Sequence, residues 1–314
     1  MKKFLFLFIA AIALSACGGD KEEVKEEVVE LKDFKDRLSY VLGSVNAKSI
    51  VGQEDPNVAR LDMNLVAKGF ESNLNDNMPD GCEETLMKLF GPYYQDFDST
   101  YAAEGAECLG KLTAYAFYRD MNSLGGLEKI DLKMVVSGFR HGLMKKDTLI
   151  ADAEKQSILQ NFIMDLNVTN GKKMMAEAKK KPGVQVFENG IIMEVIQEGK
   201  GGNPGATDDV KVEYILTSAT GDTIQSSYDM KKTNGSTESV ALKLNGGVIP
   251  GWSYALPKMK KGGKYRLWVP WELAYGEQMG KESLCFFIEL VDYAKEGTFV
   301  KPEPMADPGA AAGF

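Results

Sequence analysis

The sequence predicts an α+β protein with two folded parts, an all-α region followed by an antiparallel half-barrel that wraps one short helix. The chain has 314 residues, and this length favours two domains because single cores usually stop growing at about 100 to 200 residues. Apolar residues recur at helical spacing from 34 to 181, and they alternate with polar residues after Val184. The helical part also contains an internal duplication.

The duplicated segment reads L-D-M-N-L-V-A-K-G-F-E-S-N-L at 61–74 and I-D-L-K-M-V-V-S-G-F-R-H-G-L at 130–143. Asp62 and Asp131 are each placed to cap a helix, and apolar residues follow at spacings of three and four. Each copy stands between two further helical stretches, at 38–45 and 83–97 for the first copy and at 112–121 and 152–166 for the second. We therefore expect a three-helix unit, repeated, over 34–181.

Strand-like segments begin after Val184 and continue within 184–297. In each of them apolar and polar residues alternate, which is the period of a half-buried strand. The segments are 190–199, 210–216, 240–244, 265–269 and 284–290, and among them only 251–259 is typical of a short helix. Five antiparallel strands around one helix, with a small apolar cavity, are the expected half-barrel.

The first seventeen residues are typical of a signal peptide. Lys2 and Lys3 precede an apolar run, Phe4 to Leu14, that is too short to span a bilayer, since a spanning helix takes about 20 residues. The following Leu-Ser-Ala-Cys resembles the lipobox of bacterial lipoproteins, which implies lipidation at Cys17. The resemblance implies a protein of a Gram-negative cell envelope, attached by its N-terminal lipid to the outer membrane.

An acidic tether, 18–33, follows the lipidation site. Gly18 in place of Asp implies the outer membrane by resemblance to the usual sorting rule. Lys21-Glu22-Glu23 resembles a surface-export signal, and a solvated tether explains the same residues equally well. Both the periplasmic face and the cell surface therefore remain open. At the other end, 298–314 is rich in Pro, Gly and Ala and is predicted to be a disordered tail.

Composition excludes several classes of function. The net charge of -8 argues against a nucleic-acid groove. The single histidine, His141, has no cluster of His, Cys or Asp at ligand spacing beside it, so we expect no metal and no cofactor. Cys82 and Cys108 fit either a disulfide or two buried thiols. Cys285, within a strand pattern, is interpreted as a small core residue.

Three strings in the half-barrel carry a family resemblance: V-E-Y at 212–214, V-I-P-G-W at 248–252 and E-L-A-Y-G at 272–276, supported by K-K-G-G at 260–263 and F-F-I-E-L at 286–290. In order and approximate spacing they resemble FKBP-type peptidyl-prolyl cis-trans isomerases. The stretch 34–76, and less clearly its second copy, resembles the dimerisation region found ahead of FKBP domains in envelope isomerases. This implies a homodimer with a chaperone-like helical domain that acts on proline-containing polypeptides.

The physical chemistry of the reaction suits these residues. Rotation about an X-Pro bond breaks amide resonance and needs no proton or nucleophile, so an apolar pocket that favours the twisted amide is sufficient. By resemblance Trp252 forms the floor under the proline ring. The other implied roles are walls for Tyr214 and Phe286, hydrogen bonds from the Ile249 N–H and the Tyr275 hydroxyl, and further substrate contacts for Val248, Ile224, Gln225 and Val240. Tyr214, Trp252 and Phe286 are also interpretable as plain core residues of a small barrel.

Two departures from the family pattern suggest a weakened site. Ile224-Gln225 stands where the family usually has Phe-Asp, which removes a carboxylate and, we expect, a hydrogen-bond acceptor directed into the pocket. The loop after Tyr275 is short, and Trp271 and Met279 are candidates to replace its missing apolar surface. The alternative hypothesis is therefore a peptide-binding chaperone with the same fold and little isomerase activity.

Overall fold

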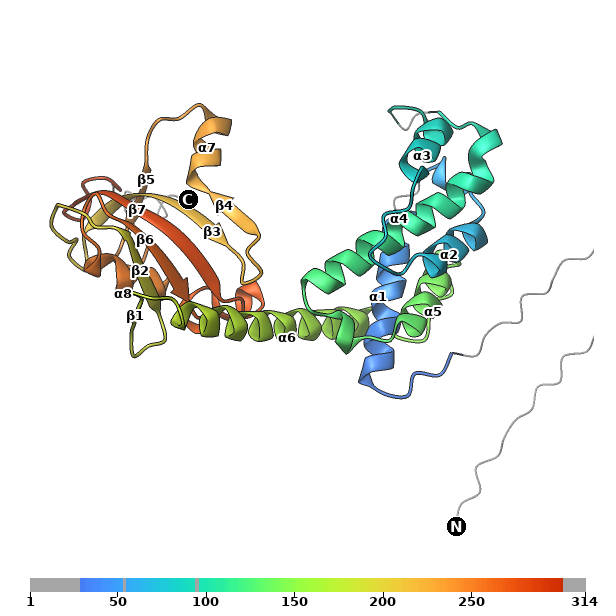
Figure 1. The fold of residues 1–314 in the computed structure, drawn as a ribbon, viewed down its shortest axis with the longest axis horizontal. Helices are drawn as coiled ribbons and strands as arrows, with labels where there is room; N and C mark the ends of the chain where they lie inside the picture. The colour runs from blue at the N-terminus through green and yellow to red at the C-terminus, as the bar shows by residue number, and fades with distance from the viewer. Residues whose placement is uncertain (1–28, 53–54, 94–95, 302–314) are drawn as a thin grey trace, which may run out of the picture. The chain divides into compact units, whose positions relative to one another are not determined.

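The computed structural model describes residues 29–52, 55–93 and 96–301 (Figure 1). The signal segment with Cys17, most of the acidic tether and 302–314 of the expected tail lie outside the described residues. Within the described ranges, no helix combines the length and the apolar character that crossing a bilayer requires. Helices occupy the first part of the chain and strands the last part, as the change of period predicted.

The N-terminal region contains six α-helices among the residues described: α1 (Phe34–Val51), α2 (Met63–Ser72), α3 (Cys82–Phe90), α4 (Ala102–Ser123), α5 (Leu132–Leu143) and α6 (Asp152–Lys179). The predicted caps are present, because the Asp62 carboxylate accepts from Asn64 N at 2.9 Å and that of Asp131 from Lys133 N at 2.8 Å. We call α1 and α2 copy 1, and α4 and α5 copy 2. The third helix of each predicted three-helix unit differs in length, because α3 has 9 residues and α6 has 28.

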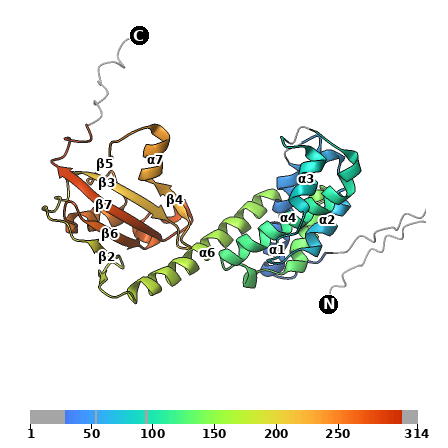
Figure 2. The same ribbon diagram turned by 45° about the horizontal axis from the view of Figure 1, so that its top comes forward.

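The two copies pack crosswise. α1 lies along α5 (Figure 1), and α2 lies along α4, as both ribbon views show (Figures 1 and 2). The apolar faces that the sequence predicted are thus buried against the other copy, with Val66, Phe70, Val135 and Phe139 fully enclosed. Between the copies, α3 is joined to α4 by a disulfide between Cys82 and Cys108, whose Cα atoms are 5.0 Å apart. This resolves the two alternatives in favour of the bridge.

The C-terminal region is one antiparallel sheet of seven strands in its described part: β1 (Gln185–Val186), β2 (Ile192–Gln197), β3 (Asp209–Thr217), β4 (Thr223–Ser226), β5 (Val240–Lys243), β6 (Lys264–Val269) and β7 (Leu284–Ala294). The strand order is β1-β2-β6-β7-β3-β4, and β5 pairs with the first half of β3. The long central strands β3 and β7 place Leu216 opposite Phe286. The predicted α+β half-barrel is confirmed, with short β1 and β4 added.

One short helix, α8 (Pro250–Ala255), packs on the concave face of this sheet, as predicted. A second helix, α7 (Ser227–Asn234), follows β4 and was not predicted (Figure 1). Its sequence, S-Y-D-M-K-K-T-N, has no apolar stripe, so periodicity gave no signal. Its ends do carry signals: Ser226 Oγ accepts from Asp229 N at 3.2 Å, and Gly235 takes a φ of 63°, in the left-handed region that glycine tolerates.

The main core lies between the sheet and α8. Its largest members with almost no exposed surface are Tyr265, Leu256, Met259, Leu267, Ile191 and Leu244. A smaller cluster forms on the other face, where Ala178 of α6 meets Ile192 of β2 and Trp268 of β6. Cys285 is partly buried beside this cluster as a free thiol, and burial raises its pKa. It is therefore a packing residue, as interpreted from the sequence.

The start of the expected tail is ordered against β3. The backbone N–H groups of Phe299 and Val300 donate to the Asp209 carboxylate at 2.9 and 3.0 Å. Burial on its own would raise the pKa of Asp209, but these backbone donors keep it below the usual value. Phe299 and Val300, which the sequence placed in the disordered tail, are therefore held at β3 by the Asp209 carboxylate.

Candidate functional site

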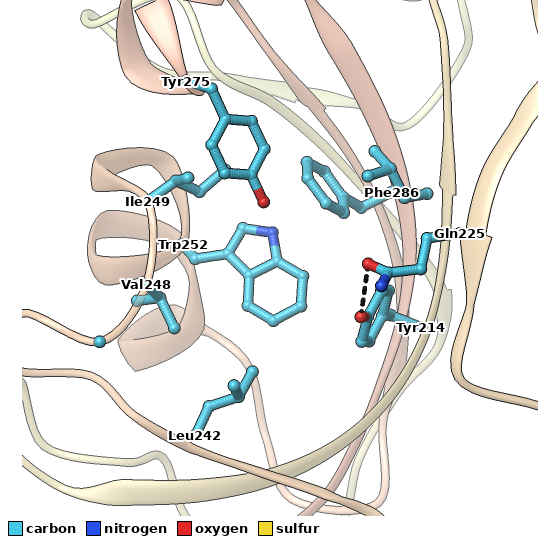
Figure 3. A pocket seen from close by; sticks show the side chains of 10 residues that line it. Tyr214, Gln225, Leu242, Val248, Ile249, Trp252, Tyr275 and Phe286 are labelled. Atoms are coloured by element: carbon cyan, nitrogen blue, oxygen red, sulfur yellow. Dashed lines mark hydrogen bonds between the residues drawn. The ribbon is translucent and has the colours of Figure 1, made fainter. Parts of the chain in front are cut away.

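A cavity of about 110 Å³ opens beside α8 (Figure 3). This volume is of the same order as that of an apolar cavity that accepts benzene, roughly 150 Å³, so its size suits one small ring. None of its lining side chains carries a formal charge. The lining residues are Tyr214, Leu216, Gln225, Leu242, Gly247, Val248, Ile249, Trp252, Tyr275 and Phe286.

Trp252 occupies the centre of the cavity wall because of the way α8 begins. Pro250 is the first helical residue, and its fixed φ suits that position, while the Ile249 carbonyl accepts from Trp252 N at 3.0 Å. Gly251 lets α8 approach β6, because a methyl group there would lie 2.5 Å from Cγ1 of Val269. The start of α8 thus fixes the indole against the sheet.

Three aromatic rings form a box around the cavity. Trp252 meets Tyr214 edge to face, with ring centroids 5.6 Å apart and planes at 85°, and it meets Phe286 at 5.2 Å and 72°. Such T-shaped pairs are favoured by the ring quadrupoles. The indole Nε1 is buried and has no hydrogen-bond partner within the described part of the protein. In Figure 3 this nitrogen faces the open side between Tyr275 and Phe286, so the cavity offers one unused donor.

Tyr214 is held by two hydrogen bonds. Its hydroxyl donates to Oε1 of Gln225 at 2.8 Å, and its backbone N–H donates to Oγ of Ser227 at 2.9 Å. Ser227 in turn donates to the buried carboxylate of Glu213 at 2.7 Å, and Lys231 forms an ion pair with the same carboxylate. Burial, followed by the nearby Tyr275, raises the pKa of Tyr214. The phenol is therefore a neutral donor throughout the physiological range.

The position of Gln225 corrects one expectation from the sequence. The carboxylate of the family pattern is absent, but the hydrogen-bond acceptor is present, because the Gln225 amide oxygen lines the cavity and accepts from Tyr214. An amide and a carboxylate share an oxygen acceptor, although only the carboxylate is charged. The expected loss of an acceptor is wrong.

Tyr275 lies at the mouth of the cavity, on the short loop between β6 and β7. Its side chain is 43% exposed, and its hydroxyl points inward over Trp252 (Figure 3). The loop continues as a single 3-10 turn, Gly276–Met279, and ends at Gly280 with a φ of 63°. The loop is as short as the sequence indicated. Trp271 and Met279 do not line the cavity, so the structure gives no support to their suggested replacement role.

The structure brings together all five residues predicted to be catalytic, and also Val248 and Gln225. It does not bring Ile224 or Val240 to the cavity. Neighbouring residues of a strand face opposite sides, so Ile224 is exposed to solvent while Gln225, next to it on β4, faces the cavity. Val240 packs against the core beside β3. Those two predictions of substrate contact are therefore not supported.

Three lining residues were missed in the sequence: Leu216, Leu242 and Gly247. Strand alternation contained the signal for the first two. Leu216 is two positions after Tyr214 and so shares its face of β3, and Leu242 has the same relation to Val240 on β5. Gly247 gave no such signal, because it lies in the loop ahead of α8.

The fold and the cavity together define a class of protein, a half-barrel with an uncharged aromatic cavity suited to a small ring. Two family models match adjoining segments of the chain. The FKBP-type peptidyl-prolyl cis-trans isomerase model matches residues 201–291, and the model of the domain amino terminal to that isomerase matches residues 114–195. The second match covers the C-terminal half of α4 together with α5 and α6, whereas the sequence resemblance was drawn mainly from 34–76 and less clearly from this second copy.

Individual relatives agree. FKBP-type peptidyl-prolyl cis-trans isomerase FkpA of Escherichia coli K12 is 32% identical over 209 residues, 59% of this chain and 72% of that protein. Outer membrane protein MIP of Legionella longbeachae is 27% identical over 204 residues, 58% of this chain and 84% of that protein. The crystal structure of FkpA from Escherichia coli aligns with 29% identity and a TM-score of 0.37, covering 62% of this chain and 96% of that one. The chain belongs to the FKBP-type peptidyl-prolyl cis-trans isomerase family.

Proposed function

We propose that the cavity around Trp252 binds the proline ring of a polypeptide and accelerates rotation about the bond before it. The observation that carries this is the uncharged aromatic lining, in a member of an isomerase family, with two hydrogen-bonding hydroxyls at its rim. Membership of this family favours an enzyme over the alternative of a chaperone without isomerase activity. The barrier of about 20 kcal/mol arises from amide resonance, which a low-polarity site weakens without acid or base.

The lining residues divide the work. Trp252 supports the ring from below, with Tyr214 and Phe286 as walls, and Val248 with Ile249 closes the side toward α8. We propose that the Ile249 N–H and the Tyr275 hydroxyl hold the backbone on either side of the bond. The indole N–H of Trp252, which has no partner in the described structure, supplies a further donor to a substrate carbonyl. A buried donor without a partner carries a free-energy penalty, and a hydrogen bond to the substrate would remove it.

The direct test is a protease-coupled isomerisation assay on a peptide of the Ala-Leu-Pro-Phe type. We expect the protein at nanomolar to micromolar concentration to speed the slow phase, and Trp252→Phe, which keeps a ring but lacks the N–H, to retain the fold with a lower rate. A slow phase that is unchanged by micromolar wild-type protein would remove the proposal.

We further propose that this chemistry takes place at the cell envelope, with Cys17 carrying the lipid. The proposal rests on the lipobox resemblance and on the relative named an outer membrane protein. Cys17→Ser should move the protein out of the membrane fraction while leaving its circular-dichroism spectrum unchanged. Sedimentation of that variant with outer membranes would refute the anchor. Protease treatment of whole cells then separates the periplasmic face from the cell surface, which Lys21-Glu22-Glu23 leaves open.

A further inference from the structure

The crosswise packing of the helical region repeats one contact twice. In the first crossing, α1 of copy 1 meets α5 of copy 2 at Gly43, where an added methyl group would lie 2.7 Å from the backbone N of Phe139. In the second crossing, α4 of copy 2 meets α2 of copy 1 at Gly110, where an added methyl group would lie 2.7 Å from the backbone N of Phe70. Glycine permits the same close backbone approach at both places.

The facing helices show the same equivalence. An added methyl group on Gly138 of α5 would lie 2.9 Å from Cα of Tyr40, and one on Gly69 of α2 would lie 3.0 Å from Cα of Glu107. Gly69 and Gly138 are the aligned glycines of the duplicated sequence. In both crossings, therefore, the first helix of one copy packs against the second helix of the other copy through equivalent residues.

The aligned phenylalanines locate the centre of this arrangement. Phe70 and Phe139 are both fully buried and stack on each other, with ring centroids 3.7 Å apart and planes at 10°. Where two copies pack, a residue that meets its own equivalent lies at a two-fold axis, because the contacts between the copies are then reciprocal. The helical region thus has the internal symmetry of an isologous dimer, formed here by two segments of one chain.

The neighbouring charges favour unlike copies over like copies. Glu71 and Arg140 follow the two phenylalanines at aligned positions and form an ion pair, Nη2 to Oε2, at 2.9 Å. Two copies of the first kind would set Glu against Glu across the same axis, and two of the second kind would set Arg against Arg. Like charges at such a point disfavour these pairings, which is how interfaces gain specificity.

We propose that the two copies pair with each other inside one chain, and that this pairing occupies the surface through which a single copy would bind a second chain. The protein is then a monomer with one isomerase domain. The segment between α2 and α4 tethers the copies, and α3 within it is fixed to α4 by the Cys82–Cys108 disulfide. A short tether gives an effective concentration on the order of millimolar, above any micromolar second chain. This inference and the homodimer expected from the sequence make opposite predictions.

Cross-linking of isotope-labelled chains distinguishes them. Lys68 on α2 and Glu107 on α4 form an ion pair between the copies at 2.8 Å, so a carbodiimide can join the amine to the carboxylate. Unlabelled and nitrogen-15-labelled chains of residues 18–314 are mixed in equal amounts, unfolded in denaturant with the disulfide intact, refolded together, cross-linked, digested and weighed. Glu107→Gln cannot form the product and identifies its peptide.

Pairing within the chain predicts that joined Lys68 and Glu107 peptides are either wholly light or wholly heavy, and that light scattering at tens of micromolar gives the mass of one chain. Mixed light and heavy pairs amounting to half of the product would show exchange between chains and overturn the proposal. A two-chain mass, even with unmixed pairs, would overturn the monomer.

A charge exchange provides an independent measurement. Arg140→Glu sets Glu against Glu71, so the urea midpoint of the helical region should fall. The combined Glu71→Arg and Arg140→Glu variant reverses the pair and should return the midpoint to that of the wild type. A double variant as weakened as the single one would contradict pairing between positions 71 and 140.

Discussion

The hydroxyl of Tyr214 donates a hydrogen bond to the amide oxygen of Gln225 at 2.8 Å, and both side chains line the cavity (Figure 3). A neutral amide therefore orients the phenol that forms one wall of the proposed proline site. Because an amide does not titrate, this orientation is the same at all moderate pH values.

Removing either partner of the Tyr214–Gln225 hydrogen bond should lower the isomerisation rate by about the same factor. We expect Tyr214→Phe and Gln225→Met each to lower kcat/KM about three- to tenfold, since one such hydrogen bond contributes about 0.5–1.5 kcal/mol. The double variant should be no slower than the slower single variant, because both changes break one bond. The protease-coupled assay measures all four proteins, and losses that multiply would show that the two residues act independently.

Replacing the amide by an isosteric acid should introduce a pH dependence. The wild-type rate is expected to be flat between about pH 4 and 8, because Gln225 has no titrating proton and burial places the Tyr214 pKa above this range. In Gln225→Glu the introduced carboxylate stands at an exposed position of β4, so it titrates at about the ordinary glutamate value of 4.3, and once ionised it accepts a stronger charge-assisted bond. Its rate should therefore rise from about pH 4 to pH 6 and then level off. A flat profile for this variant would contradict the contact.

Trp252→Ala and Tyr275→Phe should differ in kind. Trp252 is buried, and truncating a buried aromatic costs about 3–5 kcal/mol, so that variant should lose activity together with stability. Tyr275 is 43% exposed, so Tyr275→Phe should keep the wild-type melting curve and lose up to tenfold in rate. Circular dichroism of both variants separates the two effects. Full activity in Tyr275→Phe would remove the hydroxyl from the mechanism.

Much of the fold follows from local signals in the sequence. The caps at Asp62 and Asp131, the change of period after Val184 and the start of α8 at Pro250 are all local, and the structure has them. α7 was missed because a short helix without an apolar stripe, stabilised by its caps, leaves no periodic pattern.

The crosswise packing could not be predicted in the same way. Periodicity identifies the buried face of α1 or α4, but it does not say which helix covers that face, because any apolar stripe satisfies the requirement. The acceptor role of Gln225 is a similar case. The sequence shows which residue replaces the acid, whereas the 2.8 Å contact to Tyr214 depends on how β4 pairs with β3.

The disulfide between α3 and α4 should stabilise the helical region. A closed loop with a sequence separation of 26 is expected to contribute about 3–4 kcal/mol by restricting the unfolded chain. The Cys82→Ala and Cys108→Ala double variant should therefore unfold at lower urea than the wild type, and reductant should no longer shift its midpoint. Cys285→Ala is the matched control, since its thiol is free and the response to reductant should persist. A wild type that is insensitive to reductant would contradict the expected contribution.

Asp147 should make the helical region sensitive to acid. Its carboxylate accepts from Lys155 Nζ and Ser44 Oγ, each at 2.6 Å, and so joins α6 to α1. Burial alone would raise the pKa of Asp147, but these two donors lower it from 3.8 to about 2.

A carboxylate whose pKa is lower in the folded state stabilises the protein at a pH above its pKa in the unfolded chain. This stabilisation is lost as the pH falls through its pKa in the folded protein. The stability gap between wild type and Asp147→Asn should therefore shrink by about 2 kcal/mol from pH 5 to pH 2, since each pKa unit corresponds to about 1.4 kcal/mol. Urea titrations followed by circular dichroism at several pH values measure this gap. Asp165→Asn is the control, because Asp165 pairs with Lys129 at the surface, with 59% of its side chain exposed, and should show a nearly constant gap. If the stability gaps of the two variants changed equally with pH, the contacts of Asp147 with α1 and α6 would not lower its pKa as described.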